Sequence, residues 1–169
     1  MRRAVIGVFK SLDQAKEATV EIRGESLANN YISVVVRSRT LYSGKHQEEF
    51  AQELTRFPAE KMLGIFDGYL VQSGPIELPE VGEVMAGGPL AGALVQETEK
   101  GLAGNLANYG VTKEHADHYE QAVKDGSVLV VVEADSNYIN EIANHLYTYG
   151  GRQIEKWSRT TNNPTYRYK

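Results

Sequence analysis

The stretch AVIGVFKSLDQAKEATVEIRG at residues 4–24, followed by YISVVVR at residues 31–37, decides the fold of this chain. Its first six residues, AVIGVF, are an uninterrupted apolar run of the kind found in buried strands. Ser11 and Gln14 then have the spacing of a helix capping box, and β-branched residues dominate the second stretch. One face of the intervening helix is formed by Leu12, Ala15, Thr19 and Ile22. The segment therefore predicts a β-α-β unit.

A second unit of the same kind lies near the other end of the sequence. SVLVVVEA at residues 127–134 predicts an apolar strand, with Asp135 or Ser136 capping the next helix. The apolar stripe of that helix is Ile139, Ile142, Ala143 and Leu146. RQIEKW at residues 152–157 alternates as a strand does. Two such units facing each other predict an α+β fold with a ferredoxin-like antiparallel sheet and two helices on one face.

The middle segment, residues 38–126, is too long for a loop and is expected to be mostly helical. We expect a helix over Gln47–Phe57, a short strand over Tyr69–Gln72 and, in Val84–Val95, a helix with Pro89 in its first turn. Thr112 is expected to cap a further helix, whose buried face is Ala116, Tyr119 and Val123. The predicted organisation is one domain over residues 1–157 and a C-terminal tail over residues 158–169.

Composition limits the class of protein. The 169 residues include 18 basic and 22 acidic side chains, which gives a net charge of −4. Hydrophobic residues make up 41% of the chain, a share that is typical of globular proteins and excludes a collagen-like or disordered chain. The absence of cysteine excludes a disulfide framework and a thiol nucleophile, and favours a reducing compartment. The apolar run before Lys10 is too short for a signal peptide or a membrane span. We therefore expect a cytoplasmic protein that has no membrane partner.

Three stretches carry a family resemblance: VIGVFKSLDQAKEATVEIRG at residues 5–24, LPEVGEVMAGGPLAGAL at residues 78–94 and YGVTKEHADHYEQAVKDGSVLVVVEAD at residues 109–135. Together, and in this order, they resemble the general stress protein, or heat-induced stress protein, domain of bacteria. The resemblance implies a small stress-associated protein with no established enzyme activity. It brings no catalytic residues to this chain.

The Gly-rich stretch AGGPLAGAL at residues 86–94 is the first candidate ligand site. Backbone N–H groups at the start of a helix bind anions, so Gly87, Gly88 and Gly92 are candidate ligand-binding residues. The stretch has neither the GxGxxG pattern nor the lysine of a P-loop. The alternative interpretation is close packing, because small residues let a helix approach another backbone.

His115 and His118 are the candidate metal ligands. They are three residues apart on a predicted helix and can lie side by side, but a third ligand must come from another element. The alternative is an ordinary exposed helix start, in which the neighbouring acidic residues suit the helix dipole. No cofactor is predicted, and the isolated histidines His46 and His145 are interpreted as surface or interface residues.

The end of the chain places Trp157, Tyr166 and Tyr168 among basic residues, which makes these aromatic side chains candidates for a partner interface. Stacking on nucleic-acid bases is the alternative. The pair Gly101 and Gly104 resembles a KH-type loop, but acidic residues precede it. Because the whole chain is also acidic, a nucleic-acid partner is not expected.

The family resemblance and these sequence patterns lead to three hypotheses about function. The favoured hypothesis is a non-enzymatic, stress-associated binding or assembly protein that forms homo-oligomers. The first alternative is a small-ligand- or metal-binding enzyme that uses the Gly-rich turn and the His115/His118 pair. The second alternative is a self-assembling structural protein, in which open sheet edges and the aromatic tail supply the contacts.

Overall fold

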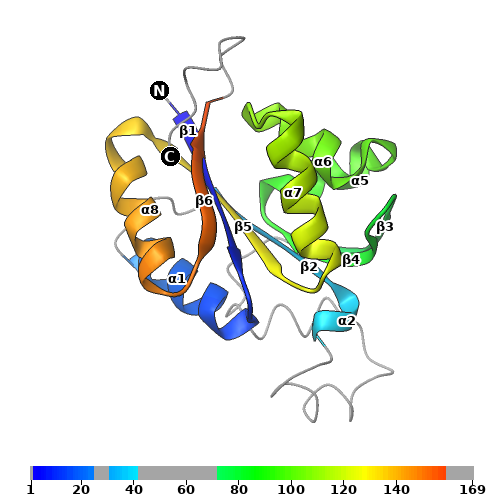
Figure 1. The fold of residues 1–169 in the computed structure, drawn as a ribbon, viewed down its shortest axis with the longest axis horizontal. Helices are drawn as coiled ribbons and strands as arrows, with labels where there is room; N and C mark the ends of the chain where they lie inside the picture. Colours follow the sequence, from blue (N-terminus) through cyan, green and yellow to red (C-terminus); the bar gives the residue numbers. More distant parts are fainter. Residues whose placement is uncertain (1, 25–30, 42–71, 159–169) are drawn as a thin grey trace.

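One six-stranded antiparallel sheet organises the molecule (Figure 1). The computed structural model describes residues 2–24, 31–41 and 72–158. The strand order across the sheet is β3-β4-β2-β5-β1-β6. The strands are β1 (Arg2–Phe9), β2 (Ile32–Arg37), β3 (Gln72–Leu78), β4 (Gly82–Gly87), β5 (Val128–Asp135) and β6 (Arg152–Trp157).

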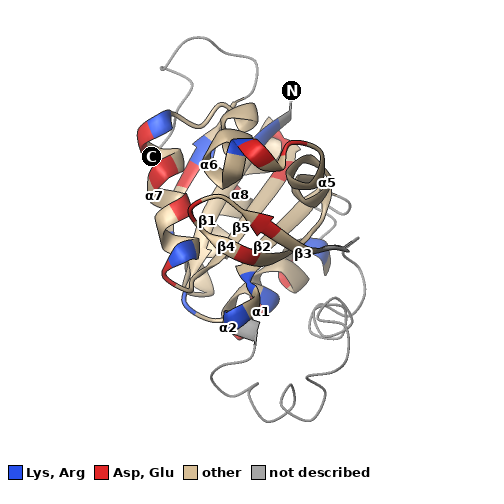
Figure 2. Cartoon of the chain, turned by 90° about the vertical axis from the view of Figure 1, so that its right-hand side faces the viewer, with Lys and Arg blue, Asp and Glu red and all other residues tan. Residues whose placement is uncertain are grey.

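Helices cover both faces of the sheet (Figure 1). The α-helices are α1 (Leu12–Gly24), α2 (Ser38–Leu41), α5 (Pro89–Gln96), α6 (Gly101–Leu106), α7 (Lys113–Lys124) and α8 (Ile139–Thr148). Short 3-10 turns span Thr98–Lys100, Ala107–Tyr109 and Ser136–Tyr138. Helices α1 and α8 pack on one face, and α5, α6 and α7 pack on the other. The charged residues lie mainly on the outer surfaces of these elements (Figure 2).

The predicted ferredoxin-like arrangement is confirmed. Strands β2, β5, β1 and β6 are neighbours in that order, and each pair is antiparallel. The helices of the two β-α-β units, α1 and α8, lie on the same face, and their expected apolar stripes point inward. The sequence pattern was informative here because each helix buries one stripe and exposes the rest.

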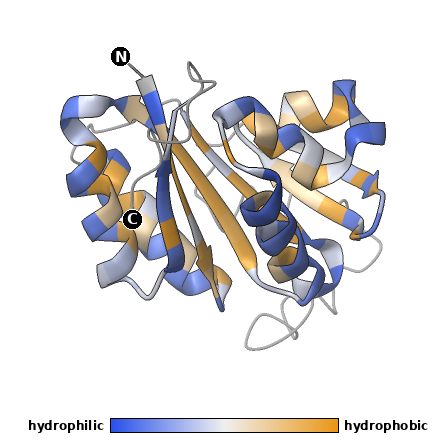
Figure 3. Ribbon diagram, turned by 45° about the horizontal axis from the view of Figure 1, so that its top comes forward, coloured by the Kyte–Doolittle hydropathy of each residue, from blue (hydrophilic) through white to orange (hydrophobic). Residues whose placement is uncertain are grey.

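Two hydrophobic cores explain why the strands are continuous apolar runs. In β1, Val5 and Phe9 point into the core beneath α1 and α8, whereas Ile6 and Val8 point into the core beneath α5, α6 and α7. Side chains of a strand alternate between the two faces of a sheet, so a strand covered on both sides is apolar at every position. Figure 3 shows these hydrophobic central strands between the two helical layers.

The β3–β4 hairpin extends the sheet beyond the four strands expected from the β-α-β units. Within Val84–Val95, the helix predicted to carry Pro89 in its first turn is confirmed, because α5 begins at Pro89, and the residues from Val84 to Gly87 form the end of β4. Of the expected strand over Tyr69–Gln72, only Gln72 lies within the described residues, where it begins β3. The expected helix over Gln47–Phe57 lies outside them.

The last described strand lies at the end of the region predicted as one domain. Strand β6 ends at Trp157, and Ser158, which was assigned to the tail, is buried with 1% of its surface exposed. Residues 159–169, which include Tyr166 and Tyr168, lie outside the described residues. Within the described ranges, no helix combines the length and the apolar character needed to cross a bilayer.

Candidate functional site

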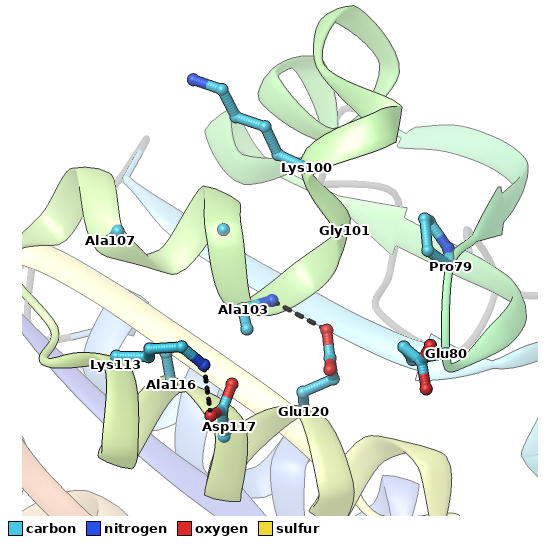
Figure 4. Close-up of a pocket in the computed structure, with 11 residues that line it drawn as sticks. Pro79, Glu80, Lys100, Gly101, Ala103, Ala107, Lys113, Ala116, Asp117 and Glu120 are labelled. Carbon is cyan, nitrogen blue, oxygen red and sulfur yellow. Dashed lines mark hydrogen bonds and ion pairs between the residues drawn. The ribbon is translucent and has the colours of Figure 1, made fainter.

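A cavity of about 430 Å³ lies between α6, α7 and the turn that joins β3 to β4. We call it the α6–α7 cavity. Its lining residues are Pro79, Glu80, Lys100, Gly101, Ala103, Gly104, Ala107, Lys113, Ala116, Asp117 and Glu120 (Figure 4). The volume is within the range of small-molecule sites, about 300–1,000 Å³.

Small side chains keep the cavity open where the two helices face each other. Ala103, Gly104 and Ala107 come from α6 and its extension, and Ala116 comes from α7. Larger apolar residues at these positions would fill the space, since protein interiors otherwise pack closely. The cavity therefore has an apolar floor built from alanine and glycine, and its charged groups lie around that floor.

Glu120 holds α6 in place at the edge of the cavity. Its Oε2 atom accepts a hydrogen bond of 3.0 Å from the backbone N–H of Ala103, in the first turn of α6 (Figure 4). The first N–H groups of a helix have no partner within the helix, so a carboxylate from α7 serves here as a cap supplied by another element. The second oxygen of Glu120 makes no hydrogen bond to another described group.

The charges around the cavity are only partly neutralised. Lys113 pairs with Asp117 at 3.0 Å, and Lys100 pairs with Glu97, which lies outside the cavity. The pKa of Lys100 is raised by its hydrogen bond to Glu97 and by the charge of that carboxylate. Among the described residues, no basic side chain lies within ion-pair distance of Glu80 or Glu120. The cavity consequently offers two carboxylates that have no cationic partner in the described part of the chain.

The Gly-rich turn has a packing role in the structure. Gly88 has a φ of 86°, and a Cβ atom added there would lie 2.1 Å from the carbonyl oxygen of Ile32. The N–H of Leu90, in the first turn of α5, already donates to Ser33 Oγ at 3.0 Å. Gly87 is buried in β4, whereas Gly92 is exposed on α5 with no atom near its added Cβ. The close-packing interpretation thus describes Gly88.

His115 has partners that the sequence did not indicate. Its Nδ1 atom lies 2.9 Å from Thr112 Oγ1, and its Nε2 atom lies 2.9 Å from Glu155 Oε2 on β6. The ring centroid of His115 is 6.3 Å from that of His118. In the described part of the chain, no group of three or more His, Cys, Asp and Glu side chains is arranged to hold a metal ion. The geometry supports a role for His115 in joining α7 to β6.

The Thr112–His115–Glu155 chain has the connectivity of a catalytic triad, hydroxyl to imidazole to carboxylate. A nucleophile also needs space for a substrate and donors for a developing oxyanion. Thr112 Oγ1 instead caps α7, and the α6–α7 cavity lies on the opposite side of that helix, next to Lys113 and Glu120. We therefore assign this chain of contacts to the structure of the domain.

Trp157 requires a correction. We expected its indole at a partner interface, but only 1% of the residue is exposed, and it packs in the core beneath α5, α6 and α7. Its ring lies 5.2 Å from that of His115 in an edge-to-face arrangement. Strand β6 alternates, and Trp157 occupies an inward position next to Ala4 of β1. An indole buried within one chain cannot also form the contact with another chain.

Comparisons with family models, with curated proteins and with solved structures find no match to this chain. The resemblance to the general stress protein domain therefore stays a prediction. The α6–α7 cavity was missed by the sequence analysis, because its residues come from three separate elements. The sequence around Gly101 and Gly104 resembles a KH-type loop and does not indicate a small-molecule cavity. Glu80 and Glu120 stand in no recognisable motif.

Proposed function

We propose that this protein is a non-enzymatic binding protein whose ligand site is the α6–α7 cavity. The observation that supports this proposal is the combination of an apolar floor with two carboxylates, Glu80 and Glu120, that have no basic partner among the described residues. Small-ligand sites typically join an apolar surface to a few polar groups that fix the orientation of the ligand. A stress-associated role is supported by the resemblance alone.

The charges favour a small molecule with a cationic group and a short apolar part. An ammonium or guanidinium group beside Glu80 and Glu120 would replace lost hydration with charge-assisted hydrogen bonds. The apolar part would cover Ala103, Ala107 and Ala116, which form the floor. An anionic ligand would meet the same carboxylates as like charges, so we expect it to be excluded.

Calorimetric titration of the whole chain with n-butylammonium, agmatine and butyrate tests this proposal. The two cations are expected to bind with a stoichiometry of one, and butyrate is expected not to bind. Glu120→Gln keeps an oxygen that accepts the N–H of Ala103 but removes the charge, so cation binding should weaken about tenfold.

The matched control is Glu114→Gln, an exposed carboxylate on the same helix and outside the cavity. It should leave cation binding unchanged within about twofold, because water and salt largely screen an exposed charge that does not line the cavity. Absence of binding by both cations, or equal weakening by the two variants, would refute the proposed site.

We also propose that the protein self-associates. Exposed apolar side chains that fit an interface between copies are present on several elements, and Tyr147 on α8 is 64% exposed. Aromatic side chains of this kind are enriched in protein interfaces. The native mass of the protein over a dilution series tests this point, and a monomer at every concentration would contradict it.

A further inference from the structure

A second hollow, of about 270 Å³, lies where α2 meets the turn between α7 and β5. It is separate from the α6–α7 cavity and shares no lining residue with it. The residues around it are Arg37, Arg39, Thr40, Asp125 and Gly126. We call it the Arg37 hollow. It lies at the end of the sheet where β2 ends and β5 begins, next to α2, which carries Arg39.

The fold fixes the guanidinium group of Arg37. On β2, Val35 faces the core beneath α5, α6 and α7, and Arg37 is the next residue on that face. Its Nη1 atom donates a hydrogen bond of 2.7 Å to the carbonyl oxygen of Lys124, in the last turn of α7. A cation is favourable there because the carbonyl end of a helix carries partial negative charge.

Hydrogen-bonding capacity remains in this arrangement. Arg37 Nε is buried and has no acceptor among the residues that the structure describes, and a buried donor without an acceptor is costly. Arg39 is exposed, and within the described ranges no carboxylate lies at ion-pair distance from either arginine. Asp125 also lines the hollow and keeps its negative charge, although its Oδ1 atom accepts a hydrogen bond of 2.9 Å from Gln121; two guanidinium groups against one carboxylate leave the lining with a net positive charge.

We infer that the Arg37 hollow binds the phosphate group of a small molecule. Two guanidinium groups that form no ion pair with a carboxylate among the described residues suit the negative charge and the several acceptor oxygens of a phosphate monoester. Arg37 is held in position before the ligand arrives, which lowers the entropy lost on binding. The volume of the hollow is slightly below that of a typical drug-sized site, so the rest of the molecule must be small or extend into solvent.

NMR titration of the ¹⁵N-labelled full chain with inorganic phosphate tests the inference, at about pH 8, where the dianion predominates. Acetate is the second probe, and ionic strength is kept constant with chloride because screening alone changes the apparent affinity. We expect saturable shifts of the amides of Thr40 and Gly126 with phosphate, and weaker binding of acetate.

Three variants separate a specific site from general attraction to basic residues. Arg39→Gln should weaken phosphate binding about tenfold, and Arg37→Lys should do the same while keeping its charge, because an ammonium lacks the planar fork. Arg152→Gln is the control, since Arg152 lies outside the hollow and its guanidinium stands over the ring of Tyr147. Its affinity should stay within about twofold of the unmodified protein.

The inference fails if phosphate produces no saturable shifts in the millimolar range. It also fails if acetate binds as tightly as phosphate, or if all three variants weaken binding equally. Because these variants leave Glu80 and Glu120 unchanged, the outcome is independent of cation binding in the α6–α7 cavity.

Discussion

Gly88→Ala is the substitution for which the structure gives the clearest expected effect. Gly88 joins β4 to α5, with φ 86° and ψ −174°, a backbone conformation that is almost confined to glycine. An alanine Cβ would lie 2.1 Å from the carbonyl oxygen of Ile32 and 2.8 Å from the Cα atom of Ser33. Both contacts are with backbone atoms, so rotation of a side chain cannot relieve them.

The magnitude follows from two separate costs. A non-glycine residue in this conformation costs roughly 1–3 kcal/mol. Displacement of β2 backbone to make room adds about 1–3 kcal/mol, the usual cost of overpacking. The expected loss is therefore about 2–6 kcal/mol, a large fraction of the roughly 5–15 kcal/mol by which folded domains are stable.

Urea unfolding, followed by far-UV circular dichroism, measures this loss. With a slope of about 2 kcal/mol per molar, a loss of 3 kcal/mol lowers the unfolding midpoint by about 1.5 M. Gly92→Ala is the matched control, because Gly92 lies within α5 and an added Cβ meets no atom within 4 Å. It should raise stability by about 0.5–1 kcal/mol, since alanine favours the helix.

The opposite signs of the two effects make the test decisive. If Gly88→Ala costs less than about 0.5 kcal/mol, the level of an ordinary surface substitution, the close approach of this turn to β2 is refuted. If Gly92→Ala is as damaging as Gly88→Ala, the helix is packed against a neighbour that the described structure does not show.

Two further predictions concern contacts of α7 and of the turn before α6. Tyr119→Phe keeps the buried ring but removes the hydroxyl that donates to a β6 carbonyl at 2.8 Å, so urea unfolding should show a loss of about 1–2 kcal/mol, and an unchanged midpoint would contradict the contact. The pKa of Lys100 is raised above 10.5 by Glu97, so this lysine contributes stability that is complete below its unfolded pKa and is lost as the pH rises through its folded pKa. In urea unfolding measured over a range of pH, Glu97→Gln should flatten the alkaline part of the plot of unfolding free energy against pH. If the variant and the unmodified protein give identical plots, the Lys100–Glu97 pair is refuted.

The two β-α-β units could be predicted from the sequence because their information is local. Leu12 and Ile22 mark the buried face of α1, and Ile139 and Leu146 mark that of α8, each within a few helical turns. The β3–β4 hairpin was not predicted, because the small residues between Val84 and Gly88 show no clear alternation of apolar and polar side chains. Pairing with distant residues makes this segment a strand: Met85 and Ala86 pair with β2, and Ala86 also pairs with Ser73 of β3.

The candidate sites were harder to predict because they depend on distances between separate elements. His115 and His118 are neighbours in sequence, but the partner of His115 is Glu155, 40 positions further along the chain. Trp157 has an aromatic side chain near basic residues, which fits an exposed interface as well as it fits a core position. Its burial depends on α7, and no pattern around residue 157 indicates that α7 covers it.

The position of β1 has a consequence for how the protein is made. This strand comes from the first residues of the chain, yet its two neighbours in the sheet, β5 and β6, come from residues 128–157. A nascent chain therefore carries the exposed apolar run AVIGVF until almost all of the domain has left the ribosome. The central sheet closes only after residues 128–157 have been synthesised, which makes folding slow and the unfinished chain prone to aggregation. Chaperone protection of this N-terminal segment would matter most when synthesis stalls.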